Sequence, residues 1–456
     1  MMLAMQPEAS KSVFRTIGEG AFWTSSSTFV VKAIGLATIF IILRQLGVGE
    51  YGVLELVLSI TTLLSIFFLP GLESIVTADM GVEKGRGDLN SARNILQAFM
   101  TLQFICATVA WTAVFFGARF FASLYNVPPH YVEVVSFLFL IGPLRSAYSI
   151  LFRVNLRFFL LSLLTVIEEG CKLAVLVILF FVTELGVFKI LFVILASQVL
   201  ALLILAPAFV RSWQLLKGGA DVPMPWWALL KGHGKWGVLS SYVGNVGKSG
   251  RLWLIQRFLG AEAVGIYSVA SGLMGHTAAL APLFTVVTPM LPQFVHDRAR
   301  FTRLVNKAIQ YQILAYLALG IIAFFAFPPI LGRLFPAYIE AFPLFQVMLV
   351  TLIPASVIII VNPVFAALKL QKSLFVSMAI RSVMTILFTY IGIMFFGIWG
   401  IAFEAMVTSI LQTVERVWTL RRKVPELIIN PLHIFRFDED DRLIIGKVRA
   451  AISRLI

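Results

Sequence analysis

Apolar positions along this chain form long runs that short polar segments separate. Each run is about 20 residues long, the length an α-helix needs to cross a bilayer. Residues 1–21 are polar and mixed, so we expect the first run to be an uncleaved anchor. The pattern predicts an all-α integral membrane protein with about twelve transmembrane helices, at residues 22–43, 53–76, 95–117, 131–152, 159–182, 187–210, 236–257, 264–292, 308–331, 341–366, 373–396 and 398–420.

Composition supports a membrane protein and sets its orientation. The chain is 59% hydrophobic and 13% charged, against about 25% charged in ordinary soluble domains. Of the 37 basic residues, 17 fall in the loops of one side, 5 in those of the other and 9 in the final segment from Arg416 onwards. The positive-inside rule then predicts a multi-pass protein of the cytoplasmic (inner) membrane with both termini cytoplasmic. The basic residues are spread over short loops, so the net charge of +14 does not indicate a nucleic-acid partner.

An internal repeat divides the chain. The segments Arg44-Gln-Leu-Gly-Val-Gly-Glu-Tyr-Gly52 and Arg257-Phe-Leu-Gly-Ala-Glu-Ala-Val-Gly265 share R-x-L-G-x-x-x-x-G at an offset of 213 residues. We expect two parallel six-helix lobes around a central cavity, an arrangement typical of transporters that rock one half against the other. The predicted segments are a cytoplasmic N-terminus (1–21), an N-terminal lobe (22–210), a cytoplasmic linker (211–235), a C-terminal lobe (236–420) and a cytoplasmic tail (421–456), which we expect to be amphipathic.

Charges inside the apolar runs are the candidate functional residues. A charge at the centre of a membrane helix costs about 2.5–3.5 kcal/mol and usually faces a cavity or a partner. Lys32 lies near the middle of the first run, and its repeat partner is Asn245, with Lys248 and Arg251 one and two turns further on. We expect these stripes to face each other and to bind phosphate or carboxylate groups. The predicted substrate-binding residues are Lys32, Asn245, Lys248, Arg251, Arg145 and Arg381.

Purely structural interpretations of these charges remain open. Lys172 follows Glu168 by four residues, which favours an intrahelical ion pair. Arg145 is close enough to one end of its run to snorkel to the interface. The other cations would staple helices together if they pair with Glu404 or Glu169. Glu168 and Glu404 are also the candidates for proton or sodium coupling.

Enzymatic chemistry is not indicated. The five histidines are scattered, and no histidine and carboxylate cluster for acid and base catalysis accompanies them. We therefore predict no catalytic residue, no metal site and no cofactor. Two alternatives remain: a membrane-bound polysaccharide polymerase or acyltransferase, and a multidrug exporter. An exporter of cationic drugs would need unpaired acidic residues where this chain has basic ones.

Short motifs in both halves carry a resemblance to a known family. The chain resembles the polysaccharide flippases of the multidrug, oligosaccharidyl-lipid and polysaccharide exporter superfamily. Members of the same superfamily that flip the peptidoglycan lipid precursor usually have two more spans than the twelve predicted here. The motifs that carry the resemblance are Trp23, Arg44-Gln-Leu-Gly47 to Tyr51-Gly52, Gly71 to Asp79 (GLESIVTAD), Leu259-Gly260 to Gly265-Ile-Tyr267, Leu334-Phe-Pro-Ala-Tyr338 and Phe396-Gly-Ile-Trp-Gly400.

This resemblance implies a function. Members of the polysaccharide flippase family flip polyprenyl-diphosphate-linked oligosaccharides to the outer leaflet for O-antigen, capsule or exopolysaccharide assembly. The substrate passes through a cationic cavity between two lobes that form a V shape. The implied partners are the lipid-linked oligosaccharide, membrane lipids, a polysaccharide polymerase and glycosyltransferases. The acidic residue that couples ions in drug-exporting relatives has no counterpart in the first run, so the resemblance leaves the coupling ion open.

Overall fold

A computed structural model describes residues 27–216, 229, 234–281, 287, 291, 297–368 and 370–427. These residues are helical and contain no strand. The first half contains Ser27–Gln45, α2 (Val48–Leu63), η1 (Ser65–Phe68), α3 (Leu72–Gly85), α4 (Leu89–Phe116), α5 (Ala118–Tyr125), α6 (Pro129–Ser136), α7 (Leu138–Val154), α8 (Phe158–Val182) and α9 (Val187–Gln214). The second half contains α10 (Gly234–Leu259), α11 (Ala261–Ala279), α14 (Arg298–Leu334), η3 (Pro336–Tyr338), α15 (Ala341–Met348), η4 (Leu349–Thr351), α16 (Leu352–Ala367), α17 (Gln371–Phe396) and α18 (Trp399–Lys423).

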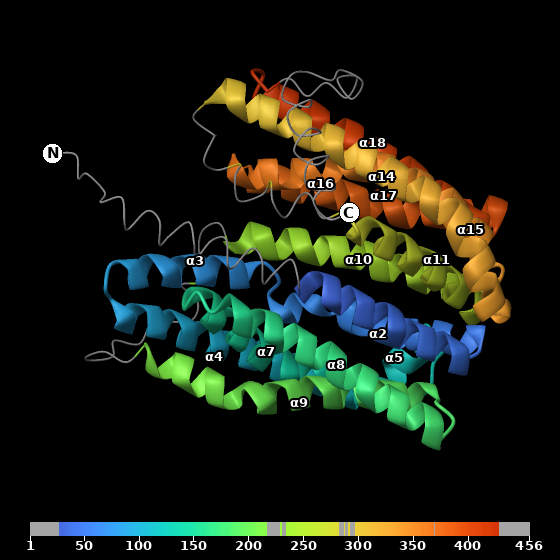
Figure 1. Ribbon diagram of the computed structural model, residues 1–456, viewed down its shortest axis with the longest axis horizontal. Coiled ribbons are helices and arrows are strands. Elements are labelled where there is room, and N and C mark those ends of the chain that lie inside the picture. Colours follow the sequence, from blue (N-terminus) through green and yellow to red (C-terminus); the bar gives the residue numbers. More distant parts are fainter. Residues whose placement is uncertain are drawn as a thin grey trace, which may run out of the picture.

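The helices form two lobes, as the repeat predicts (Figure 1). Helices up to α9 make one lobe, drawn blue to green, and α10 to α18 make the other, drawn yellow-green to red. Several passes consist of more than one helix, including α2 with α3 and α15 with α16. The predicted N-terminal segment, most of the linker and most of the tail lie outside the described residues.

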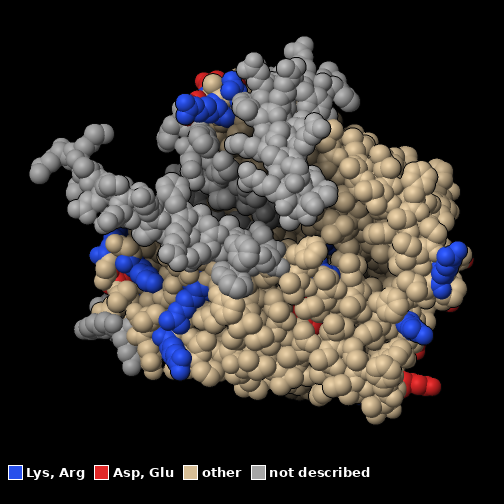
Figure 2. Space-filling view, in the orientation of Figure 1, with Lys and Arg blue, Asp and Glu red and all other residues tan. Residues whose placement is uncertain are grey.

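Seven of the described helical segments are long and apolar enough to cross a membrane: Ser27–Gln45, Leu89–Phe116, Pro129–Val154, Val187–Gln214, Arg298–Leu334, Ala341–Phe365 and Gln371–Phe396. Helices α8 and α10 are also 25 and 26 residues long, but both carry several of the charges discussed above. Charged side chains on the visible face lie mostly towards the ends of the long axis, and a band with few charges separates them (Figure 2). The distribution is that of a protein that spans a bilayer.

The predicted span 53–76 is wrong as a single helix. Helix α2 begins at Val48, and the chain breaks between η1 and α3, where Leu69 and Gly71 have φ of 49° and 88°. Pro70 explains the break, because proline disfavours helical geometry at the residue before it and donates no backbone hydrogen bond. The Phe68 carbonyl that the break frees accepts a 2.9 Å hydrogen bond from Gln103 Nε2. Broken helices are tolerated in membranes when neighbours satisfy the backbone in this way.

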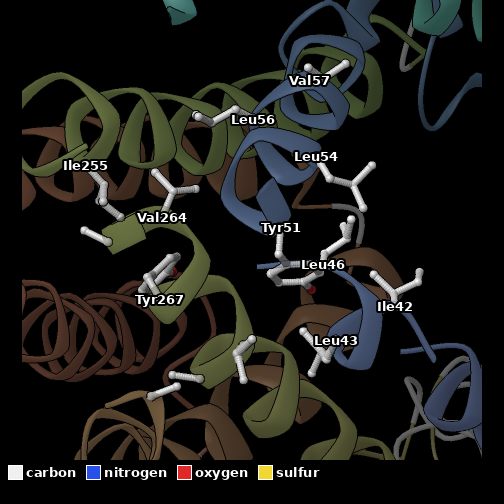
Figure 3. Close-up of a cluster of buried hydrophobic side chains, with 14 of the residues drawn as sticks. Ile42, Leu43, Leu46, Tyr51, Leu54, Leu56, Val57, Ile255, Val264 and Tyr267 are labelled. Atoms are coloured by element: carbon white, nitrogen blue, oxygen red, sulfur yellow. The ribbon is translucent and has the colours of Figure 1, made fainter. Parts of the chain in front are cut away.

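A large apolar cluster joins the two lobes (Figure 3). Ile42 and Leu54 from the first lobe belong to the same buried cluster as Ile255 and Val264 from the second. Tyr338 Oη extends the junction by donating a 3.0 Å hydrogen bond to the Leu46 carbonyl. The two copies of the repeat motif therefore pack against each other at the boundary between the lobes.

Candidate functional site

A cavity of about 660 Å³ lies among α10, α11 and α17 of the C-terminal lobe. Its cations are Lys248, Arg251 and Arg381, and Glu55 of α2 contributes a carboxylate from the other lobe. Its neutral polar lining consists of Ser240, Ser241, Asn245, Tyr267, Ser268, Ser271, Ser382 and Thr385. The volume is within the range of about 300–1,000 Å³ for ligand pockets.

Close packing of α10 on α17 brings the cations together. A Cβ on Gly247 would lie 2.9 Å from Ser382 Oγ and 3.2 Å from its Cα. Ser382 Oγ in turn donates a 2.6 Å hydrogen bond to the Val243 carbonyl. Small residues let helices approach in this way inside membranes. Arg381, next to Ser382 on α17, therefore lies at the same cavity as Lys248 of α10.

Arg251 is held by a buried network. Its guanidinium lies 2.8 Å from Glu404 Oε2, and its Nη1 donates a 2.7 Å hydrogen bond to Tyr267 Oη. Glu404 is fully buried and also accepts a 2.9 Å hydrogen bond from Thr408 Oγ1. Because a carboxylate compensates its charge, Arg251 is a fixed donor at the cavity wall.

Lys248 and Arg381 have no such compensation. In the described ranges, no carboxylate oxygen lies within 4 Å of either side chain, whereas Arg251 has Glu404. Lys248 is exposed to the cavity. A lysine presents a point charge and an arginine a planar fork of donors, and both suit phosphate oxygens. The cavity is therefore chemically suited to an anion with several oxygen acceptors.

Lys32 lies in a different pocket from the other predicted cations. This pocket, of about 300 Å³, is lined by the first helix, α2, α8, α9 and His276 of α11. It also holds Glu169 and Lys172, which form an ion pair of 2.5 Å. Two cations and two carboxylates, Lys32, Lys172, Glu55 and Glu169, thus line it, whereas the cationic cavity has three cations and one carboxylate. Lys32 and Lys248 thus line two adjoining pockets that share Glu55, and that their stripes face each other across one space stays a prediction.

The two pockets follow the repeat. The first helix and α8 line one, and their repeat equivalents α10 and α17 line the other. Each pocket also receives one titratable side chain from the opposite lobe: Glu55 enters the cationic cavity, and His276 enters the Lys32 pocket. Glu55 lines both spaces and is therefore at the boundary between them.

Other predicted site residues take different positions. Arg145 lines neither pocket, and its Nε lies 3.0 Å from Glu168 Oε2. The predicted Glu168–Lys172 pair is wrong, because Glu168 turns to Arg145 and Lys172 to Glu169. Asn245 lines the cationic cavity and donates a 2.8 Å hydrogen bond across the lobes to Ser65 Oγ. Glu404 forms the staple that was one of the open alternatives for Arg251.

Several charged residues within the apolar runs escaped the sequence analysis, and two of them, Glu55 and Arg416, are notable in the structure. Glu55 lies within the second apolar run, and a complete search of that run for charges would have found it. A side-chain hydrogen bond joins it to Tyr51, one turn earlier on α2. Arg416 counted with the tail, but it belongs to α18 and is fully buried. The described residues contain no group of three metal-binding side chains.

Comparison with known proteins agrees with this architecture. The family model described as polysaccharide biosynthesis protein matches residues 17–295. No curated protein sequence matches the chain. A multidrug resistance MATE family transporter of the MOP superfamily, in an inward-facing conformation, superposes with a TM-score of 0.71 at 16% identity over 87% of this chain and 95% of that chain.

Two further solved structures are similar. The lipid II flippase MurJ, in an inward closed conformation, has a TM-score of 0.69 at 13% identity over 87% of both chains. A MOP superfamily transporter from Pyrococcus furiosus, whose binding pocket is described as having reverse polarity, has a TM-score of 0.67 at 16% identity over 90% of this chain and 96% of that chain. At these identities the likeness establishes the fold alone, an all-α membrane protein with two lobes.

Proposed function

Because the chain belongs to the polysaccharide biosynthesis protein family, we propose that it flips polyprenyl-diphosphate-linked oligosaccharides across the cytoplasmic membrane. The product would supply the assembly of O-antigen, capsule or exopolysaccharide. The proposal places both termini on the cytoplasmic side, where basic loop residues are concentrated. Polysaccharide polymerase and glycosyltransferases are its proposed partners.

The cationic cavity is the observation that carries this proposal. Lys248 and Arg381 lie without compensating carboxylates in a space of about 660 Å³ that hydroxyls and Asn245 also line. A diphosphate neutralises the cations, and hydroxyl and amide groups suit a sugar. Moving the lipid-linked head group through the protein avoids the cost of taking its charges through hydrocarbon.

Alternating access gives the two lobes their role. We propose that the head group enters the cavity from the cytoplasmic side, and that the lobes then rock about their apolar junction until the cavity faces outwards. The bulk of the polyprenyl chain stays in the bilayer throughout. Lys32 and Arg145 act in this scheme as further contacts for the substrate as it moves, and Glu168 and Glu404 as candidates for ion coupling.

Transport into vesicles tests the proposal. Purified protein in vesicles is supplied with a polyprenyl-diphosphate-linked disaccharide on one side, and an enzyme that acts only on the other side measures its arrival. We expect Lys248→Ala and Arg381→Ala to reduce the rate by more than about tenfold, and Lys248→Arg to retain most of it. Lys189→Ala is the matched control, because Lys189 binds a carbonyl of a neighbouring loop residue outside the cavity. Normal transport by the Lys248→Ala, Arg381→Ala double variant would refute the site.

Drug export is the second candidate, since a multidrug transporter has a similar fold. The lining of the cavity opposes it: three cations and a single carboxylate, Glu55, would repel a cationic drug. An exporter would protect cells against cationic compounds without any change in surface polysaccharide. Growth assays of a deletion strain, with and without the chain, therefore distinguish the two functions.

A further inference from the structure

A third space lies between α17 and α18, beside the cationic cavity. It has a volume of about 390 Å³. Ile380 and Met384 of α17 line one side, and Leu411, Val414 and Trp418 of α18 line the other. Val414 and Trp418 are 61% and 53% exposed, so the groove opens on the surface that faces lipid. We call this space the α17–α18 groove.

The open surface of the groove is almost wholly apolar, but Ser377, Arg381, Thr408, Gln412 and Glu415 also line it. The Glu415 carboxylate accepts a hydrogen bond from Ser377 Oγ. Gln412 lines it and is only 4% exposed, and neither its amide nitrogen nor its amide oxygen has a hydrogen-bond partner in the structure. An unpaired amide is costly to bury away from water. A purely hydrocarbon occupant would leave this amide unsatisfied, so the groove suits a ligand that brings polar atoms to one end.

Arg381 connects the groove to the cationic cavity. It lines both spaces, and it has no carboxylate within 4 Å among the described side chains. A phosphate bound at Arg381 would therefore lie at the inner edge of the groove and at the wall of the cavity together. This geometry matches a molecule with a charged head group and a long apolar chain.

The depth of the groove argues against an ordinary membrane lipid. Trp418, at one end, stacks under Arg422 at 3.9 Å, and such a pair marks the membrane–water interface. Trp418 follows Leu411 by seven residues, about 10 Å along the helix. A phospholipid keeps its phosphate at the interface, near Trp418, whereas Arg381 and Gln412 offer their polar contacts deeper in the bilayer.

We propose that the α17–α18 groove holds the first isoprene units of the substrate's lipid chain while the diphosphate binds at Arg381. This inference rests on the proposed function and adds a site for the chain to the site for the head group. The chain leaves the protein sideways between α17 and α18, so a long polyprenyl tail never has to enter the cationic cavity. The groove then selects substrates by their lipid as well as by their charge.

A binding measurement separates the two sites. Leu411→Trp fills the groove, and Ile410→Trp is its matched control, because Ile410 is the neighbouring residue, is 50% exposed and does not line the groove. The protein is placed in lipid nanodiscs, and its affinity is measured for a polyprenyl-diphosphate-linked disaccharide and for a water-soluble sugar diphosphate without the chain. We expect Leu411→Trp to weaken binding of the first by about tenfold and to leave that of the second unchanged.

The outcomes distinguish the groove from the function. Unchanged binding of both compounds by Leu411→Trp would overturn the groove. If the unmodified protein fails to bind the sugar diphosphate, or binds it independently of Lys248, the proposed function fails instead. If Leu411→Trp, but not Ile410→Trp, loses binding of both compounds, the tryptophan distorts the cavity. The cross-linking experiment then decides whether the groove holds the lipid chain.

Cross-linking identifies the occupant directly. A photoreactive benzoylphenylalanine replaces Leu411, and in the control protein it replaces Ile410, in vesicles that contain the lipid-linked disaccharide. We expect the polyprenyl chain to be captured from position 411 and bulk phospholipid from position 410. Capture of phospholipid alone at both positions would show that an ordinary lipid fills the groove and would overturn the proposal.

Discussion

Gly52 and Gly265 make reciprocal backbone contacts at the junction between the lobes. A Cβ on Gly52 would lie 1.9 Å from the Ala261 carbonyl oxygen, and a Cβ on Gly265 would lie 2.1 Å from the Val48 carbonyl oxygen. The two glycines occupy the last position of the repeated R-x-L-G-x-x-x-x-G motif. Helices α2 and α11 therefore meet through the same surface of each repeat, as at a twofold interface.

This contact predicts that the junction accepts no side chain. Gly52→Ala and Gly265→Ala place a methyl group inside the partner backbone, so we expect both to force the lobes apart and to reduce transport by more than about tenfold. Gly272→Ala, also on α11, has open space around it and serves as the control. The vesicle assay measures the rate, and a cysteine pair across the junction reports its closure. Normal transport by the double alanine variant would show that this closed contact is not part of the cycle.

Replacing both residues of the Arg251–Glu404 pair should affect the stability of the protein differently from its ligand binding. Removing one partner of a buried ion pair costs about 3–5 kcal/mol, because the other charge is left uncompensated. We expect Glu404→Ala to lower the thermal unfolding temperature strongly, and the double change Arg251→Met, Glu404→Met to recover much of the loss.

The control for this pair is Glu340→Ala, because Glu340 is exposed. Sugar diphosphate binding should stay weak in the double variant, since it still lacks the Arg251 donor at the cavity wall. A double variant as unstable as Glu404→Ala would contradict the pairing as the source of the effect.

Removing the charge of Glu55 should strengthen ligand binding, whereas removing a cation of the cavity should weaken it. It is the only acidic residue among those that line the cationic cavity in the described part of the chain. Glu55→Gln removes its negative charge and should tighten sugar diphosphate binding by about fivefold, equivalent to about 1 kcal/mol. Isothermal titration measures the affinity, with Glu50→Gln on the same helix as the control. Weaker binding by Glu55→Gln would mean that the carboxylate helps to hold the ligand.

Because Lys32 and Lys248 line different pockets, we expect their substitutions to differ in their effect on ligand affinity. We expect Lys32→Ala to change the affinity for a sugar diphosphate by less than about threefold and Lys248→Ala to weaken it by more than about tenfold, while both reduce transport. Comparing binding with transport for the two variants tests this. Equal losses of affinity would place both lysines at one binding site.

Much of the fold follows from the amino-acid sequence. In hydrocarbon the backbone can satisfy its hydrogen bonds only within a helix or a closed barrel, so long apolar runs specify helices strongly. The repeat motif identified the two halves, because both copies must form the same junction. The break at Pro70 was harder to predict, because membrane helices also tolerate proline. Helix α7 continues unbroken through Pro143, and α9 continues through Pro207.

The charged residues required the tertiary structure. Glu168 has Lys172 one turn away in sequence, but it pairs with Arg145 from another helix. Sequence spacing places side chains on a helix face, but it does not say how that helix is rotated against its neighbours. Packing sets this rotation, as at the Gly247–Ser382 contact between α10 and α17.

Length, hydrophobic pattern and repeat thus specify a two-lobed helical membrane protein with unusual charges inside its spans. Only the packing of helices decides which charges share a space. It places Lys248, Arg251 and Arg381 around one cavity and Lys32 in another, with Glu55 between them. The physical reason is that a cation in a membrane helix can be accommodated by a partner, a cavity or an interface, and the sequence does not distinguish these environments.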